Sequence, residues 1–228
     1  MNLILAIAAF LAFPALMLAP AASAENPPSV PNVSNSNAAN TPDEATKTPD
    51  GKFVQDLGDR AIAQITDKSI SQDERNQRYG QLLRDSFDMH AIGHFVAGRA
   101  FNNASAEQQQ EYMNLFEKLV VKTYGDRLNL YSGEGFRVKS VRPESDQDAI
   151  VSSEITHADG SAPARVDWRV RNKNGKPAVI DVSVEGVSQS VTQRDEYSSI
   201  IQRDGGKLDG LIDLMRKQVD SQQSQQNQ

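Results

Sequence analysis

The period of the hydrophobic pattern changes twice along the chain, and these changes constrain the fold more than any other feature of the sequence. As far as Tyr131, apolar residues recur three and four positions apart, as they do on one face of an α-helix. From Gly133–Gly135 onward they alternate with polar residues, as in half-buried β-strands, and after Gly186 the helical spacing returns. The order of helices, strands and helices predicts an α+β fold.

Four helical segments are expected before the sheet. The first carries one apolar stripe, and the second begins at a capping-box pattern, Ser71–Glu74. A short apolar segment, Ile92–Val96, is the third, and the longest opens at Ser105 with Gln108 three residues later. Their inward positions are Phe53, Leu57, Ala61, Ile65, Tyr79, Leu82, Leu83, Phe87, Tyr112, Leu115, Phe116, Leu119, Val120, Tyr124, Leu128 and Tyr131.

The sheet is expected to have about four antiparallel strands, with one apolar face and one polar face. Its clearest strand alternates Val166, Trp168 and Val170 with charged residues, and Asn174–Gly175 after it predicts a tight hairpin. The apolar face should carry Phe136, Val138, Ala149, Val151, Ile155, Val166, Trp168, Val170, Ala178, Ile180, Val182 and Val184. The polar face should carry Arg165, Asp167, Arg169, Arg171, Asp181, Ser183 and Glu185.

Two helices separated by a break at Gly205–Gly206 are expected after the sheet. Their inward residues are Tyr197, Ile200, Ile201, Leu208, Leu211, Ile212, Met215 and Val219. The ordered body should then span residues 51–219. Residues 25–50 are rich in Pro, Asn, Ser and Thr and should form a disordered leader, and residues 220–228, rich in Gln and Ser, a disordered tail.

The first 24 residues read as a signal peptide. Leu3–Leu18 is almost entirely apolar, and Ala22-Ser23-Ala24 places small residues where a signal peptidase cleaves, before Glu25. The apolar run is short for a membrane span, and no Lys or Arg precedes it. We therefore expect cleavage and export, with a retained N-terminal anchor as the alternative.

Composition excludes several classes of function. The 228-residue chain has no Cys, which rules out disulfide scaffolds, thiol catalysis and iron–sulfur clusters. With 24 Lys and Arg against 30 Asp and Glu, the net charge is -6, so a general role in binding nucleic acid is not expected. No cofactor is expected either, because the common glycine-rich phosphate loops do not occur.

The sequence motifs indicate no catalytic or metal site. His90 and His94 are four residues apart, but Ala91 follows His90 where a zinc protease needs Glu, and Gly93 weakens the helix between them. No nucleophile-elbow motif is present, and Asp167 lies on the polar side of its strand. The chain is not expected to be an enzyme; an isomerase or hydrolase with a cone-shaped cavity is the alternative.

Two surfaces leave a structural and a functional interpretation open. The aromatic stripe Tyr112, Phe116, Tyr124 and Tyr131, together with the apolar face of the sheet, forms either an ordinary core or the wall of an apolar ligand cavity. The outward set Arg165, Arg169 and Arg171 is either a solvated strand face or a docking patch for acidic partners or lipid headgroups.

Several sequence blocks resemble the MlaC family of periplasmic phospholipid carriers, also called toluene-tolerance (Ttg2) auxiliary proteins. The first is Ile92-Gly93-His94-Phe95-Val96-Ala97-Gly98-Arg99, followed by Ser105–Phe116 and Tyr124–Tyr131. After Asn174-Gly175 come Val184-Glu185-Gly186-Val187-Ser188, Thr192-Gln193-Arg194-Asp195-Glu196-Tyr197 and Gly205-Gly206-Lys207-Leu208-Asp209-Gly210-Leu211. The blocks occur in order at compatible spacing over most of the body.

The resemblance implies a curved sheet and helices that enclose an apolar cavity for lipid acyl chains. It implies a carrier that shuttles phospholipid between an outer-membrane lipoprotein–porin complex and an inner-membrane ABC transporter with a substrate-binding subunit, and so maintains outer-membrane lipid asymmetry. A hopanoid or other polycyclic lipid is the alternative cargo. The residues expected to bind lipid are Phe116, Leu119, Val120, Tyr124, Phe136, Val138, Val151, Ile155, Val166, Trp168, Val170, Ile180, Val182 and Val184.

Overall fold

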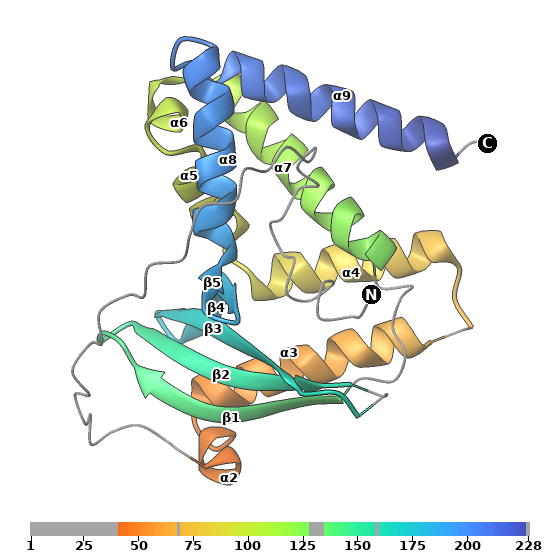
Figure 1. The fold of residues 1–228 in the computed structure, drawn as a ribbon, viewed down its shortest axis with the longest axis vertical. Coiled ribbons are helices and arrows are strands. Elements are labelled where there is room, and N and C mark those ends of the chain that lie inside the picture. The colour runs from red at the N-terminus through yellow and green to blue at the C-terminus, as the bar shows by residue number, and fades with distance from the viewer. Residues whose placement is uncertain (1–40, 68, 128–134, 158–159, 227–228) are drawn as a thin grey trace.

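The computed structural model describes residues 41–67, 69–127, 135–157 and 160–226, and it has the expected order of helices, strands and helices (Figure 1). The first helices are α2 (Pro42–Ala45), α3 (Pro49–Thr66), α4 (Gln72–Ser86), α5 (Met89–Ala97), α6 (Arg99–Asn103) and α7 (Ala106–Arg127). The strands are β1 (Gly135–Pro143), β2 (Asp148–Thr156), β3 (Ala164–Lys173), β4 (Lys176–Val184) and β5 (Val187–Ser188), followed by α8 (Gln189–Arg203) and α9 (Asp209–Gln226). The α+β prediction is confirmed.

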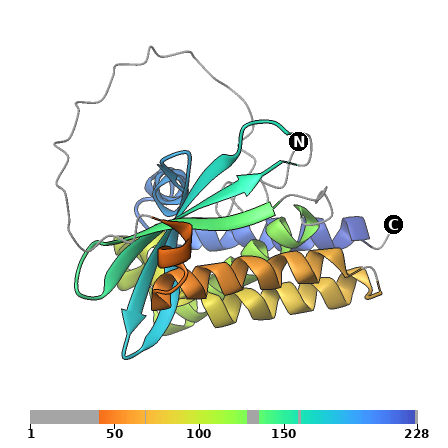
Figure 2. The ribbon, with the colours of Figure 1, turned by 90° about the horizontal axis from the view of Figure 1, so that it is seen from below.

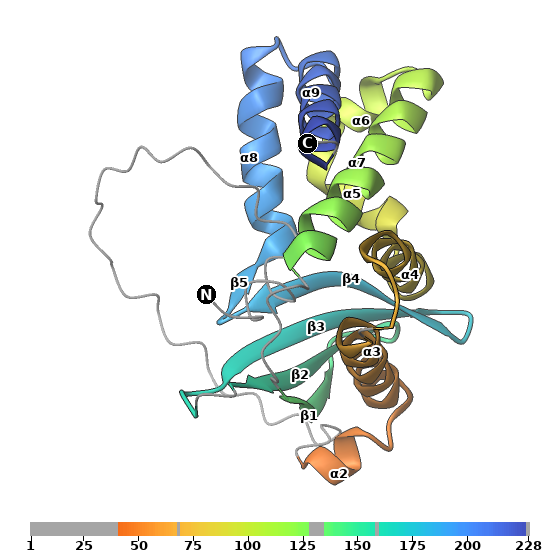
Figure 3. The same cartoon turned by 90° about the vertical axis from the view of Figure 1, so that its right-hand side faces the viewer.

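The helices cover the sheet in successive layers (Figure 3). Helix α3 packs on β1, α4 packs on α3, α7 packs on α4, and α9 packs on α7. Helices α5 and α8 pack on each other and reach the sheet at β4. Seen from below, α3 and α4 run side by side under the sheet (Figure 2). The side of the sheet that faces α3 and α4 is therefore the one that the core occupies.

Side-chain caps begin the helices where the sequence signals stand. Ser71 Oγ accepts a hydrogen bond from the Glu74 backbone N–H at 3.2 Å, as the capping box predicts for α4. At α7 the box is reciprocal: Gln108 N–H donates to Ser105 Oγ at 3.2 Å, and Ser105 N–H donates to Gln108 Oε1 at 2.9 Å. Helix α5 forms despite Gly93, because Asp88 caps its first turn and the Gly lets α7 approach closely.

The strands follow one another in an antiparallel order, β1-β2-β3-β4-β5. At the predicted hairpin, Asn174 and Gly175 have φ values of 54° and 78°, which only a primed turn uses. Neighbouring segments cover the free edge of β1 and the part of β4 that β5 does not pair with: Gln55 Oε1 accepts from Val138 N–H of β1 at 3.0 Å, and Asp88 N–H donates to Val179 O of β4 at 3.0 Å. Neither of these edges can then add another strand there.

Helical structure extends beyond the predicted body at both ends. At the N-terminal side α2 and the start of α3 precede Gly51, and Ala45 is fully buried against the rest of the domain. At the C-terminal side α9 continues through the Gln- and Ser-rich segment to Gln226, since Gln is a good helix former. The proposed signal peptide, and the leader as far as residue 40, lie outside the described residues.

A glycine sets how closely α3 approaches the sheet. A Cβ atom added to Gly58 would overlap the ring of Phe136 on β1. Gly80 of α4 is also helical and buried, but the nearest atom to its added Cβ would be Val121 Cγ1 at 3.3 Å. A Gly→Ala substitution therefore adds the same methyl group at both positions, but it meets a closely packed ring only at Gly58.

We expect Gly58→Ala to destabilise the protein, because overpacking costs about 1–3 kcal/mol and exceeds the gain of about 1 kcal/mol in helix propensity. Gly80→Ala, the matched control, should stay within about 1 kcal/mol of wild type. Urea unfolding followed by circular dichroism measures both. Equal effects of the two substitutions would contradict the close approach of α3 to Phe136.

Candidate functional site

The apolar face of the sheet is built from four cross-strand rows that the hydrogen-bond register aligns. Each row takes one residue from successive strands, and most of its members are buried. The rows are Phe136, Ile155 and Ala164; Val138, Ser153, Val166 and Val184; Val141, Val151, Trp168 and Val182; and Pro143, Ala149, Val170 and Val179. Eight of the predicted lipid-binding residues (Phe136, Val138, Val151, Ile155, Val166, Trp168, Val182 and Val184) lie in the first three rows, and Val170 lies in the fourth.

Trp168 is the largest side chain in the rows, and its polar group is satisfied inside the layer. Its ring centroid lies 6.0 Å from that of Phe136 and 6.5 Å from that of Phe87 at the end of α4. Its Nε1–H donates to Ser153 Oγ at 2.9 Å, and that hydroxyl donates to Val166 O at 3.1 Å. The sequence gives no signal for this role of Ser153 beyond the alternation of β2, which places its side chain inward. The layer keeps an apolar character because its indole and hydroxyl bond to each other.

The predicted helical residues lie in the same hydrophobic cluster but farther from the sheet. Phe116, Leu119 and Val120 of α7 are buried, and α7 packs on α4, α5 and α9. The ring centroids of Phe116 and Tyr112 lie 5.9 Å apart in a stacked arrangement. A Cβ added to Gly93 of α5 would lie 3.2 Å from Phe116 Cδ1. In Figure 1 α4 lies between α7 and α3, and it packs on both. The side chain of Tyr124 lies outside the described residues.

The face predicted for Ile180 is wrong, because β4 contains a β-bulge. The register with β3 shifts between Arg169, which pairs with Asp181, and Val170, which pairs with Val179. The extra residue lets Val179 take the inward position, while Ile180 lines a pocket with Arg169 and Asp181 on the opposite face. Strict period-2 alternation predicts Ile180 and Ala178 on the apolar side, and no residue of β4 by itself indicates the bulge.

The arginines of β3 do not form one free basic patch. Arg165 pairs with Asp167 at 2.9 Å, and Arg169 pairs with Glu144 at 2.9 Å. Arg171 donates two hydrogen bonds of 2.7 Å to the carboxylate of Asp148, which is only 5% exposed. The hydrogen bond from Arg171 holds the pKa of Asp148 below its ordinary value, against the effect of burial. The outward set of three arginines is therefore not one continuous docking patch.

The two histidines of α5 have structural partners. His90 and His94 pack edge-on against Phe101, and their ring centroids lie 6.0 and 5.1 Å from that of Phe101. His94 Nε2 also lies 2.7 Å from Asn102 Oδ1. Within the described ranges no group of three His, Asp or Glu side chains is arranged to bind a metal ion. No helix in the same part of the chain is long and apolar enough to cross a membrane.

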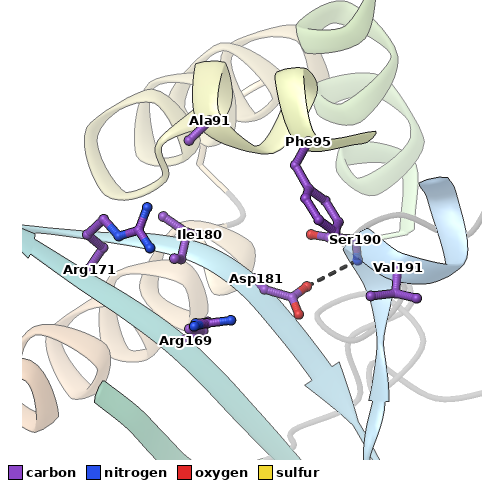
Figure 4. A pocket seen from close by; sticks show the side chains of 8 residues that line it. All are labelled: Ala91, Phe95, Arg169, Arg171, Ile180, Asp181, Ser190 and Val191. Carbon is purple, nitrogen blue, oxygen red and sulfur yellow. Dashed lines mark hydrogen bonds between the residues drawn. The ribbon is translucent and has the colours of Figure 1, made fainter. Parts of the chain in front are cut away.

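Of the pockets lined by described residues, one borders the apolar layer and another lies on the opposite face of the sheet. One, of about 350 Å³, lies where α3 begins beside the β1–β2 hairpin and is lined by Asp50, Val141 and Asp148 among others. Burial raises the pKa of Asp50, whose Oδ1 has no hydrogen-bond partner. The other, of about 220 Å³, lies between α5, β4 and the start of α8 (Figure 4). Both volumes are small compared with the roughly 1,000 Å³ at the upper end of ordinary ligand pockets.

The fold and this layer define a class of protein: a small α+β domain whose antiparallel sheet turns one continuous apolar face toward stacked helices. A family model described as "MlaC protein" matches residues 55–217. The chain therefore belongs to the MlaC family, as its sequence blocks indicate.

Two curated relatives match in sequence. "Toluene tolerance protein ttg2D" of Pseudomonas putida is 29% identical over 110 residues, which are 48% of this chain and 51% of the relative. "Intermembrane phospholipid transport system binding protein MlaC" of Haemophilus influenzae is 29% identical over 128 residues, 55% of this chain and 59% of the relative. The chain thus spans about half the length of the curated relatives it matches.

A solved structure shares the fold. It is the phospholipid-binding protein from Ralstonia solanacearum in complex with a phospholipid, with a TM-score of 0.64 and 23% sequence identity. The superposition covers 75% of this chain and 96% of that chain.

The Asp148–Arg171 pair predicts a stability that depends on pH. Because the folded-state pKa of Asp148 is depressed, its stabilisation is present above the unfolded pKa of about 4 and is lost as the pH falls through the folded value. Asp148→Asn should cost roughly 1–3 kcal/mol at pH 7, since it leaves Arg171 without its partner. The difference from wild type should shrink at pH 3.

Urea unfolding at the two pH values measures this effect. Asp146→Asn, an exposed position in the same hairpin, is the matched control and should change stability little at either pH. A loss for Asp148→Asn that is the same at both pH values would contradict the assignment to the ionised pair.

Proposed function

We propose that the protein is a phospholipid carrier of the periplasm that holds the acyl chains between the apolar face of its sheet and the helices that cover it. The observation that carries the proposal is the continuous apolar layer of four cross-strand rows, in a chain of the MlaC family. The relative from Haemophilus influenzae, by its name a phospholipid transport binding protein, and the phospholipid-bound structure from Ralstonia solanacearum support the same ligand class.

The physical need for such a carrier is large. A pair of acyl chains of about thirty methylenes would lose on the order of 20 kcal/mol on entering water, at about 0.8 kcal/mol per methylene. A phospholipid therefore crosses an aqueous compartment only when a protein surface replaces the bilayer. This transfer makes and breaks no covalent bond, so a catalytic residue has no part in it.

The acyl chains lie, in this proposal, on the rows around Val151, Trp168 and Val182, with Phe116, Leu119 and Val120 of α7 at the deep end of the same hydrophobic cluster. The headgroup stays near solvent, because burying a phosphate without a paired charge is costly.

The rest of the proposal concerns transport. The N-terminal 24 residues direct export and are cleaved, and the carrier exchanges lipid with an outer-membrane lipoprotein–porin complex and with an inner-membrane ABC transporter through its substrate-binding subunit. This exchange maintains the lipid asymmetry of the outer membrane. The direction of transfer comes from the partners, since a carrier with equal affinity for both moves nothing uphill.

A matched pair of substitutions on β4 tests the lipid site. Val184 and Ile180 are both half-buried apolar residues of this strand, but they face opposite sides of the sheet. Val184→Glu should reduce co-purifying phospholipid at least about fivefold, because a carboxylate in an apolar layer is costly. Ile180→Glu should leave the lipid content unchanged. Mass spectrometry of organic extracts, with thermal melts to verify folding, gives the result.

Equal lipid loss in both variants, with both folded, would place the lipid elsewhere. Extracts of the wild-type protein that contain no stoichiometric lipid would reject the carrier function itself.

Photo-cross-linking maps the site without changing the protein. A phospholipid with a diazirine near the end of one acyl chain, exchanged into the wild-type protein and irradiated, should label peptides of β2 and β3 around Val151 and Trp168. The label should be absent from the outer-face residue Arg165. Peptide mass spectrometry locates the adducts, and labels confined to the polar face would overturn the placement of the acyl chains.

A further inference from the structure

Two exposed large hydrophobic side chains of the described residues lie beside one pocket: Phe95 at 41% and Val191 at 48% exposure. They line the pocket of about 220 Å³ between α5, β4 and the start of α8 (Figure 4). A third, Val187 at 57% exposure, pairs with Val184 and so faces the side of the apolar rows. Apolar side chains concentrated around one pocket mark an interaction site more often than scattered exposure does.

The aromatic rim of this pocket is held in place. Arg194 of α8 donates a hydrogen bond of 2.8 Å to Phe95 O, and its guanidinium lies 4.8 Å from the centre of the Phe95 ring. The exposed ring is therefore fixed from behind by a cation–π contact, and little side-chain entropy remains to be lost on binding. A fixed aromatic ring beside a concave pocket is typical of a surface that receives an anchor side chain.

The pocket also contains an unsatisfied polar group. Ser190, in the first turn of α8, is 2% exposed, and its Oγ has no hydrogen-bond partner. Figure 4 shows this hydroxyl turned toward the space beneath Phe95, away from the axis of α8. A buried hydroxyl without a partner costs free energy, which a ligand with a suitable acceptor recovers.

The remaining lining groups offer hydrogen-bond donors. Arg169 and Arg171 reach the pocket from β3, and their ion pairs with Glu144 and Asp148 use Nε and Nη2. Within the described residues, the Nη1 group of neither arginine donates a hydrogen bond. The pocket's own carboxylate, Asp181, already accepts bonds from Ser188 Oγ at 2.6 Å and Ser190 N–H at 3.1 Å. The donors around the pocket are two guanidinium groups, a hydroxyl and the positive end of α8. The one carboxylate in the lining already accepts two hydrogen bonds.

We propose that this pocket is a docking site for a partner protein, which inserts an acidic side chain between Arg169, Arg171 and Ser190. An apolar neighbour of that side chain on the same segment lies on Phe95 and Val191. The surplus of hydrogen-bond donors in the lining calls for a group that only accepts hydrogen bonds, and a carboxylate is that group in proteins. The volume suits one side chain rather than a lipid, which favours a protein segment over a membrane surface.

The proposal does not depend on lipid binding, because the pocket lies on the face of the sheet opposite the apolar rows. Binding is tested with two capped peptides, acetyl-Ala-Leu-Glu-Leu-Ala-amide and its Gln counterpart, titrated into the isotope-labelled full chain. Saturable shifts of the Ser190 and Val191 amide signals are expected with the Glu peptide. The Gln peptide should bind about tenfold more weakly, because it lacks the charge-assisted hydrogen bonds.

Val191→Glu is the main variant, because it removes an apolar contact and places a negative charge at the rim. Position 191 is three residues after the helix cap Ser188, where Glu completes a capping box, so the fold should tolerate it. The matched control, Ser199→Glu, adds the same charge at an exposed position of the same helix. We expect Val191→Glu to weaken binding of the Glu peptide at least about tenfold, and Ser199→Glu to leave it unchanged.

Ser190→Ala gives a second, nearly isosteric measurement, and it should weaken the Glu peptide several-fold more than the Gln peptide. Equal affinities for the two peptides, or an unchanged affinity in Val191→Glu, overturn the proposal. Absence of peptide binding together with Val191-dependent sedimentation on phosphatidylglycerol vesicles also overturns it, in favour of a membrane-binding surface.

Discussion

The requirement to cover one apolar face of an antiparallel sheet determines the arrangement of the molecule. Four aligned rows of apolar side chains form that face, and α3 and α4 bury it while α7 and α9 add further layers. The polar groups inside the layer are internally satisfied, as the bond from Trp168 to Ser153 shows. The layer therefore presents hydrocarbon rather than open hydrogen-bonding groups, which is the property that acyl chains need.

The opposite face of the sheet is held by ion pairs rather than by apolar packing. Its charged side chains pair across strands, and the buried carboxylate of Asp148 lies between Arg169 and Arg171. The Arg171–Asp148 pair joins directly opposite residues of β3 and β2 and leaves the pocket beside α5 open. The two faces thus give the sheet two chemically distinct surfaces, one that accepts hydrocarbon and one that offers hydrogen-bond donors at its edge.

Much of this arrangement could be predicted from the sequence, because periodicity and capping signals act locally. The capping boxes at Ser71 and Ser105, the hairpin at Asn174 and the inward set of β3 all follow from residues a few positions apart. The face of Ile180 could not be predicted, since the bulge depends on how β4 registers with β3. The distance of Phe116 from the sheet depends likewise on how the helices stack. Composition also could not show that Asp148 pairs with the arginines, because its position opposite them arises only when β2 and β3 align.

The bulge at Ile180 lies on a strand that contributes to both surfaces. Val182 and Val184 of β4 face the proposed lipid layer, whereas Ile180 and Asp181 line the pocket proposed for a partner. A carrier releases its lipid to a partner only if partner binding lowers its affinity for lipid, and this coupling is reciprocal. Among the described elements, β3 and β4 both contribute residues to both surfaces, so the two proposed sites share these strands. The bulge, an irregularity that the period of the sequence conceals, brings Ile180 to the pocket side of β4 and leaves Val182 and Val184 on the side of the layer.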